Sequence, residues 1–154
     1  MKNLLITIFF TLLLSLGATA ENIVVGDRVP DLSIRQWLMD SQPSDAEYTC
    51  YIFYHSQSGL CNKSLENIRQ YAAGSNSSLN VVIITKEEYS SAGVKLTRYL
   101  NDHTGVAFDD NGRTFRYFGV KYIPFCVVSH KKRVVWCGNG NLLSNKVLDS
   151  ILTK

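Results

Sequence analysis

The sequence predicts an α/β fold in which a central mixed β-sheet carries helices on both faces. Short apolar runs rich in β-branched and aromatic residues alternate with segments of helical period. Two later apolar runs flank a tight basic turn, which is typical of a β-hairpin, and an amphipathic pattern of helical period closes the chain. Without the first twenty residues, whose pattern is described next, the 134 residues that remain suit one compact domain with one core.

The first twenty residues are typical of a cleaved signal peptide. Lys2 supplies a positive start, Leu4 to Leu16 form an apolar stretch, and Ala18-Thr19-Ala20 is a small-residue cleavage site. A retained membrane anchor is the alternative, but this apolar stretch is short for it. We therefore expect an exported protein, periplasmic or secreted, with residues 21–154 as its single domain.

The mature chain has a weak net charge. Removing twenty of 154 residues leaves 134, and the loss of Lys2 lowers the charge from +3 to +2. The electrostatic field of a net charge of +2 is too weak to indicate a nucleic-acid partner. No later apolar run approaches the roughly 18 residues of a spanning helix, so we expect no membrane span after cleavage.

The elements of the first half follow from local patterns. Val24 to Asp31 is expected to be extended and closed by Pro30. We then expect a strand at Tyr48 to His55 and, after a break at Gly59, a helix with apolar residues every three to four positions that ends at Gly74. A strand at Leu79 to Thr85 and a weaker helical stripe at Val94, Leu96, Tyr99 and Leu100 follow.

The second half predicts a short strand, a helical turn, a hairpin and a final helix. These are Val106–Phe108, Arg113–Gly119, Phe125–Ser129 with Arg133–Gly138, and the segment after Ser144. If the hairpin turns at residues 130–132, Cys126 lies opposite Trp136. Cys126 and Cys137 then point to opposite faces and cannot easily form a disulfide.

Four segments in this order resemble the thioredoxin fold, and more closely the exported TlpA-type thiol–disulfide oxidoreductases. They are Val25-Gly26-Asp27-Arg28-Val29-Pro30, Phe53 to Cys61, Gly119-Val120-Lys121-Tyr122-Ile123-Pro124, and Val134-Val135-Trp136-Cys137-Gly138. The family counterparts are a VGxxAPxF-like entry, a strand ending in FWATWCGPC, a GVxxIP segment and a VxWxG closing strand. The resemblance covers nearly all of residues 24–154.

The resemblance implies a redox site with one cysteine missing. The family motif Cys-x-x-Cys reads Ser58-Gly59-Leu60-Cys61 here. In the family, the first cysteine attacks the substrate disulfide and the second resolves the mixed disulfide. A serine forms no disulfide, so dithiol exchange within this motif is excluded. By position, Ser58 is also a helix N-cap. Cys61 is left as the candidate reactive thiol.

The resemblance further implies a peptide-binding groove beside a cis proline. Pro124 takes the place of the family's cis proline, although a trans proline that starts an edge strand is the alternative. Ile123, Tyr122 and Tyr54 are the other candidate substrate-binding residues; the aromatic ones, with Phe125, are alternatively core. In this fold Cys50 and Cys126 lie on neighbouring strands. Two alternatives follow: the two cysteines contact each other, or each is a buried free thiol that packs as a small apolar residue.

Three functions are compatible with these residues. The protein is a thioredoxin-like oxidoreductase that works through Cys61 alone, by a mixed disulfide with an exported protein or peptide, or it is a non-catalytic peptide-binding module. The third is a one-cysteine peroxiredoxin-like peroxidase that uses Cys61 with Ser58. His55 is a candidate base for Cys61. No metal site and no cofactor is expected.

Overall fold

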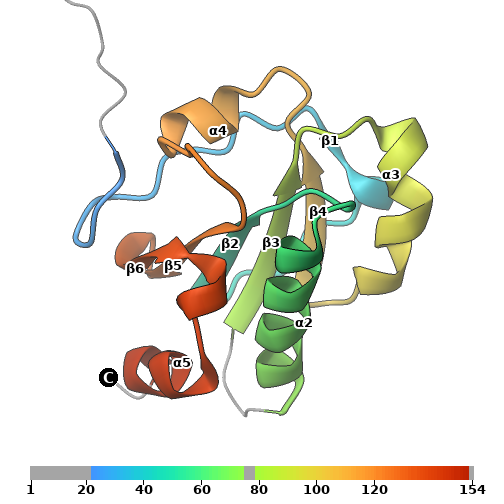
Figure 1. Cartoon of the computed structure of the whole chain (residues 1–154). Coiled ribbons are helices and arrows are strands. Elements are labelled where there is room, and N and C mark those ends of the chain that lie inside the picture. Colours follow the sequence, from blue (N-terminus) through green and yellow to red (C-terminus); the bar gives the residue numbers. More distant parts are fainter. Residues whose placement is uncertain (1–21, 75–78, 153–154) are drawn as a thin grey trace, which may run out of the picture.

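The computed structural model describes residues 22–74 and 79–152, so the expected signal peptide lies outside the described residues. Six strands form one sheet in the order β1-β4-β3-β2-β5-β6 (Figure 1). The strands are β1 (Gln36–Trp37), β2 (Tyr48–Phe53), β3 (Leu79–Thr85), β4 (Thr104–Phe108), β5 (Phe125–His130) and β6 (Arg133–Asn139). The helices are α2 (Gly59–Gly74), α3 (Tyr89–Leu96), α4 (Arg113–Tyr117) and α5 (Asn145–Leu152), with 3₁₀ turns η2 (Leu38–Asp40), η3 (Thr97–Tyr99) and η4 (Gly140–Leu142).

The sheet is mixed, as predicted. β2 lies near its centre and pairs in parallel with β3 and antiparallel with β5. β3 pairs in parallel with β4, while β1 and β6 are antiparallel edge strands. Every residue of β3 is buried, which explains why the strand is mostly apolar, apart from Asn80 and Thr85, and does not alternate.

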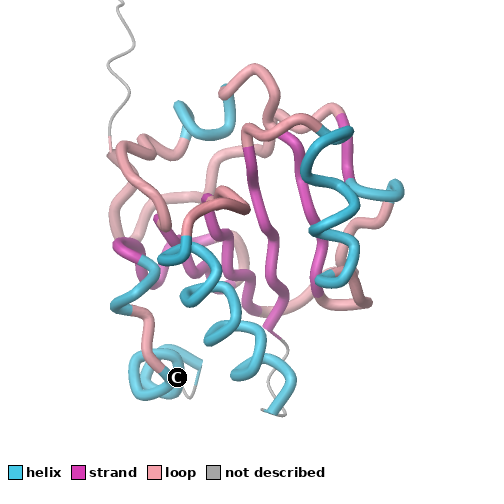
Figure 2. The backbone as a smooth tube through the Cα atoms, turned by 45° about the vertical axis from the view of Figure 1, so that its right-hand side comes forward, coloured by secondary structure: helices cyan, strands magenta, loops and turns pink. Residues whose placement is uncertain are grey.

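Helices cover both faces of the sheet, which confirms the predicted α/β architecture. On one face, the core is formed by α2, α3 and α5 against inward residues such as Ile52 and Ile83 (Figures 1 and 2). On the other face, α4 and the N-terminal segment pack on Phe53, Ile84 and Val127. None of the helices formed by the described residues has the length and apolarity needed to cross a bilayer.

The N-terminal segment differs from the expected extended chain. Asp27 N–H donates to the Val24 carbonyl at 3.2 Å, and Gly26 adopts φ +97°, so the chain turns here. After the turn, Val29 N–H donates to the Lys132 carbonyl at 2.9 Å, which holds this segment against the start of β6. The sequence pattern also missed β1 and η2, since a two-residue strand has no period to detect.

The hairpin register also differs from the prediction. His130 pairs with Arg133, so the turn consists of only two residues, Lys131 and Lys132, both at positive φ. A bulge between Val128 and Ser129 shifts the pairing by one more residue, and Cys126 lies opposite Gly138 instead of Trp136. Because the total shift is two residues, Cys126 and Cys137 still lie on opposite faces of the sheet, as expected.

Candidate functional site

The candidate site lies where β2 leads through residues 54–58 into α2. The Oγ of Ser58 accepts a hydrogen bond from Cys61 N–H at 3.3 Å, and the Ser58 carbonyl accepts one from Asn62 N–H at 3.0 Å. These are the two bonds of a helix N-cap, made by the residue that the sequence resemblance aligns with the family's first cysteine. Ser58 therefore has a structural role in starting α2.

Cys61 is fully buried together with two other cysteines. Cys50, Cys61 and Cys126 have no exposed surface, belong to the same core cluster, and are all free thiols. Burial, followed by the neighbouring Cys50, raises the pKa of the Cys126 thiol. Cys137, half-buried on the other face, has a pKa raised by burial and then by Asp27. Neither of these two environments activates a thiolate.

The loop before α2 is anchored by Glu87, which the sequence analysis did not single out. One carboxylate oxygen of Glu87 accepts a hydrogen bond from Ser56 N–H at 2.8 Å and another from the Thr85 hydroxyl at 3.0 Å, and the other oxygen accepts one from the Ser56 hydroxyl. Burial alone would raise the pKa of Glu87, but the hydrogen bonds from Ser56 and Thr85, with nearby His55, hold it below the 4.5 of a free glutamate.

A signal for Glu87 does exist in the sequence. It follows the predicted strand that ends at Thr85, and in a parallel pair the carboxyl ends of neighbouring strands meet at one edge of the sheet. The loop after Phe53 and the residues after Thr85 therefore lie together. Glu87 could be placed at the site only once the pairing of these two strands, β2 and β3, was known.

His55 and Tyr54, both predicted site residues, contact groups other than Cys61. The Nδ1 atom of His55 accepts a hydrogen bond from Gln57 N–H at 3.2 Å and lies 3.7 Å from a carboxylate oxygen of Glu87. Tyr54 is buried and donates its hydroxyl hydrogen to Asn62. Burial, and then the neighbouring Tyr99 hydroxyl, raises the pKa of Tyr54.

The residues around Pro124 form a groove beside this loop. The Ile123–Pro124 peptide bond is cis, and Pro124 is buried, whereas Tyr122 is 49% exposed and Ile123 36% exposed. A hollow of about 220 Å³ lies here, and we call it the Pro124 groove. It brings together four predicted site residues, Tyr54, His55, Tyr122 and Ile123. The other residues that line it are Lys86, Phe115, Val120 and Lys121. Phe125 is buried and packs on Tyr122, so it belongs to the core.

The main chain at Ile123 remains available for a ligand. Within residues 22–74 and 79–152, neither its N–H nor its carbonyl hydrogen-bonds to another residue. The next residues along the chain are held firmly, since Gly140 N–H donates to the Pro124 carbonyl at 3.0 Å. Ile123, which lines the groove, thus has a free N–H and a free carbonyl, and it precedes a residue whose carbonyl is hydrogen-bonded.

A metal has no obvious ligand set here. In the part of the chain that the structure describes, no three His, Cys, Asp or Glu side chains are grouped so that they could hold an ion.

Comparisons with known proteins identify the fold. No protein-family model matches the sequence, and no curated protein matches it. Solved structures do match it, and together with the sheet topology they define the class: this chain has a thioredoxin-like fold.

Among the similar structures are proteins whose names refer to disulfide isomerisation, oxidoreduction or interchange. A putative protein disulfide isomerase from Bacteroides thetaiotaomicron has a TM-score of 0.67 at 14% identity, over 86% of this chain and 92% of that one. The thioredoxin domain of a thiol-disulfide oxidoreductase from Bacteroides vulgatus has a TM-score of 0.65 at 14% identity, over 84% and 99%. A putative thiol:disulfide interchange protein DsbE from Chlorobium tepidum has a TM-score of 0.62 at 19% identity, over 84% and 99%.

Proposed function

We propose that this chain is an exported thioredoxin-like protein that has lost dithiol exchange and binds an extended segment of an exported peptide or protein in the Pro124 groove. One observation carries the proposal. The residue in the nucleophile position, Ser58, caps α2, and the remaining thiol, Cys61, is fully buried beneath it. The chain therefore has the thioredoxin-like fold, but no exposed thiol lies at the site to carry out redox chemistry.

The groove supports peptide binding by main-chain pairing. An extended peptide that lies beside Ile123 can accept from its free N–H and donate to its free carbonyl, in the manner of an added strand. The exposed side chains of Tyr122 and Ile123 supply apolar contacts next to these polar groups. Large aromatic side chains beside unpaired backbone groups are a combination suited to recognising peptides.

The two covalent alternatives both require the sulfur of Cys61 to reach a partner. A mixed disulfide needs attack on a partner's disulfide, and a peroxidase needs attack on peroxide; each needs an accessible thiolate. The zero exposure of Cys61 favours the non-covalent function over both. A native-state thiol titration tests this point, because at most the half-buried Cys137 should react before denaturation, and all four cysteines after it. Rapid reaction of Cys61 in the native protein would restore the covalent alternatives.

The loss of redox turnover is tested by restoring the missing cysteine. In an insulin-reduction assay with dithiothreitol, the wild-type protein should stay near the background rate. Ser58→Cys should raise the rate by orders of magnitude, because a thiol at the N-terminus of a helix has a lowered pKa. Ser58→Ala is the matched control and should remain inactive. Wild-type turnover at the rate of an ordinary thioredoxin would contradict the proposal.

Peptide binding is tested with a displayed library of random short peptides. Sequences enriched on the wild-type protein should lose binding to Tyr122→Ser. The control is Tyr117→Ser, since Tyr117 is 53% exposed, similar to Tyr122, but does not line the groove. Failure to enrich any peptide, or equal binding by both variants, would contradict a peptide-binding function for this groove.

A further inference from the structure

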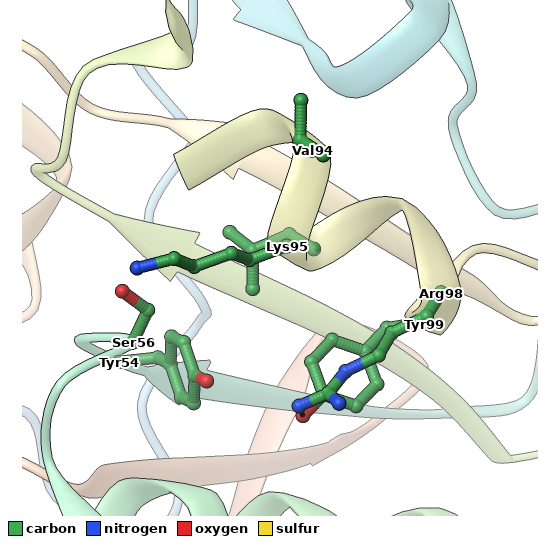
Figure 3. A pocket seen from close by; sticks show the side chains of 7 residues that line it. Tyr54, Ser56, Val94, Lys95, Arg98 and Tyr99 are labelled. Carbon is green, nitrogen blue, oxygen red and sulfur yellow. Dashed lines mark hydrogen bonds between the residues drawn. The ribbon is translucent and has the colours of Figure 1, made fainter. Parts of the chain in front are cut away.

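A second hollow lies on the other side of Tyr54, between the site loop and α3. It has a volume of about 320 Å³, and we call it the basic pocket; its lining residues are Tyr54, Ser56, Val94, Lys95, Leu96, Arg98 and Tyr99. Figure 3 shows Lys95 extending from α3 toward Ser56, with Arg98 alongside the ring of Tyr99. Because Tyr54 lines both hollows, the basic pocket is directly adjacent to the Pro124 groove.

The charged groups that line the basic pocket are all cationic. Lys95 and Arg98 are exposed, and neither forms an ion pair with a carboxylate in residues 22–74 and 79–152. Arg98 instead donates a hydrogen bond to the Tyr99 hydroxyl at 2.7 Å. The nearest acid at the loop, Glu87, is only 11% exposed and already accepts hydrogen bonds from Ser56 and Thr85.

A third cation adds to this positive potential. The guanidinium groups of Arg98 and Arg69 lie 4.8 and 4.9 Å from the centre of the same Tyr99 ring. The guanidinium of Arg69 lies 3.5 Å from the carboxylate of the half-exposed Glu66. Its Nε atom is buried and has no hydrogen-bond partner among the described residues. Both guanidinium groups thus pack on the Tyr99 ring, which itself lines the basic pocket, and they add positive charge beside it.

The Pro124 groove repeats this pattern. Its lining contains Lys86 and Lys121 but no Asp or Glu, so no carboxylate lines either hollow. Lys86 lies over the ring of Phe115 at 4.6 Å and is in no ion pair in the described part of the chain. A surface that surrounds a peptide groove with unpaired cations is complementary to an acidic ligand.

We propose that the basic pocket binds a carboxylate of the partner, an Asp or Glu side chain of a peptide whose main chain lies in the Pro124 groove. Lys95 and Arg98 form ion pairs with this carboxylate, and Tyr99 holds the guanidinium of Arg98 in place. This proposal rests on the peptide-binding function proposed above and adds its specificity: the partner segment is acidic. Charged groups placed in this way select the partner and speed its encounter with the groove.

The test uses two small compounds that differ only in charge. N-acetylglutamate α-methylamide and N-acetylglutamine α-methylamide are titrated into ¹⁵N-labelled protein, and backbone amide shifts are followed by NMR. The glutamate compound should shift the amides of Ser56, Lys95, Arg98 and Tyr99 saturably. It should bind about fivefold more tightly than the glutamine compound, as expected for a few exposed ion pairs.

Charge reversal locates the site. Lys95→Glu should remove the preference for the glutamate compound, while Lys146→Glu, with the same change of charge at an exposed position of α5, should keep it. Equal affinity for both compounds, or a preference that survives Lys95→Glu, would overturn the proposal. Inorganic phosphate is a third probe, and markedly tighter binding of phosphate would overturn the assignment to a carboxylate.

The outcomes also separate this inference from the proposed function. If library peptides bind the Pro124 groove without enrichment of Asp or Glu, and the glutamate compound causes no shifts, the acidic specificity is refuted and peptide binding stands. If no peptide binds but the glutamate compound behaves as expected, peptide binding is refuted and the pocket is a site for small carboxylates.

Discussion

Glu87 should stabilise the folded protein through the loop that carries the candidate site. Replacing it with glutamine removes the charge that accepts hydrogen bonds from Ser56 and Thr85 and places an amide N–H₂ against their donors. Hydrogen bonds to a charged group contribute about 1.5–3 kcal/mol each, and water compensates part of the loss because Ser56 is only half-buried. We expect Glu87→Gln to lower the free energy of unfolding by about 2 kcal/mol at neutral pH.

The pH dependence of this effect has a definite sign. The pKa of Glu87 is lower in the folded protein than the 4.5 of a free glutamate, so folding is favoured by its ionisation. Its contribution is complete above about pH 4.5 and is lost as the pH falls through the lower folded value. Because glutamine does not titrate, the stability gap between wild type and Glu87→Gln should narrow below pH 4.5.

Urea unfolding followed by far-ultraviolet circular dichroism measures both effects. Glu88→Gln is the matched control, since Glu88 is exposed and its side chain does not cap α3. It should change stability by less than about 0.5 kcal/mol, as is usual for exposed positions. The reasoning is refuted if Glu87→Gln and Glu88→Gln are equally stable at neutral pH, or if the gap for Glu87→Gln is unchanged in acid.

Two further substitutions test contacts that position the Pro124 groove. Gly140→Ala should lower the free energy of unfolding by about 1–3 kcal/mol, because a Cβ there would lie 2.8 Å from Cys126 Sγ and overlap the Ser64 hydroxyl. Gly59→Ala has open space around its Cβ and should be near neutral in the same urea titration; equal effects would refute this account. Asp109→Ala should cost about 2–4 kcal/mol, since its buried carboxylate accepts hydrogen bonds from the N–H groups of Thr114 and Phe115 at the start of α4. The control is Asp110→Ala, since Asp110 is the exposed neighbour of Asp109. If the melting temperature of Asp109→Ala is not lower than that of Asp110→Ala, this role of Asp109 is refuted.

The local patterns were sufficient for most of the elements. The predicted strand Leu79–Thr85 has the same bounds as β3. The helix predicted after the break at Gly59 is α2, which ends at Gly74 as expected but already begins at Gly59. These elements can be predicted from the sequence because burial on both faces of a strand, or on one face of a helix, determines the spacing of apolar residues. The N-cap at Ser58 is local as well, since its Oγ and the Cys61 N–H are three residues apart.

The contents of the site depended on tertiary structure. Cys61 is inaccessible because α2 packs its inward face on the sheet, and no local pattern reports the exposure of a residue in the first turn of a helix. Glu87 binds the loop, and Lys95 and Arg98 line the pocket beside it. All three lie in segments that follow β3, so their role exists only once β3 pairs with β2. The sequence alone thus indicated a thioredoxin-like scaffold and predicted a helix N-cap at Ser58. The tertiary packing decided that the remaining thiol is buried and that unpaired cations surround the groove, because burial and charge balance are properties of contacts between segments distant in the chain.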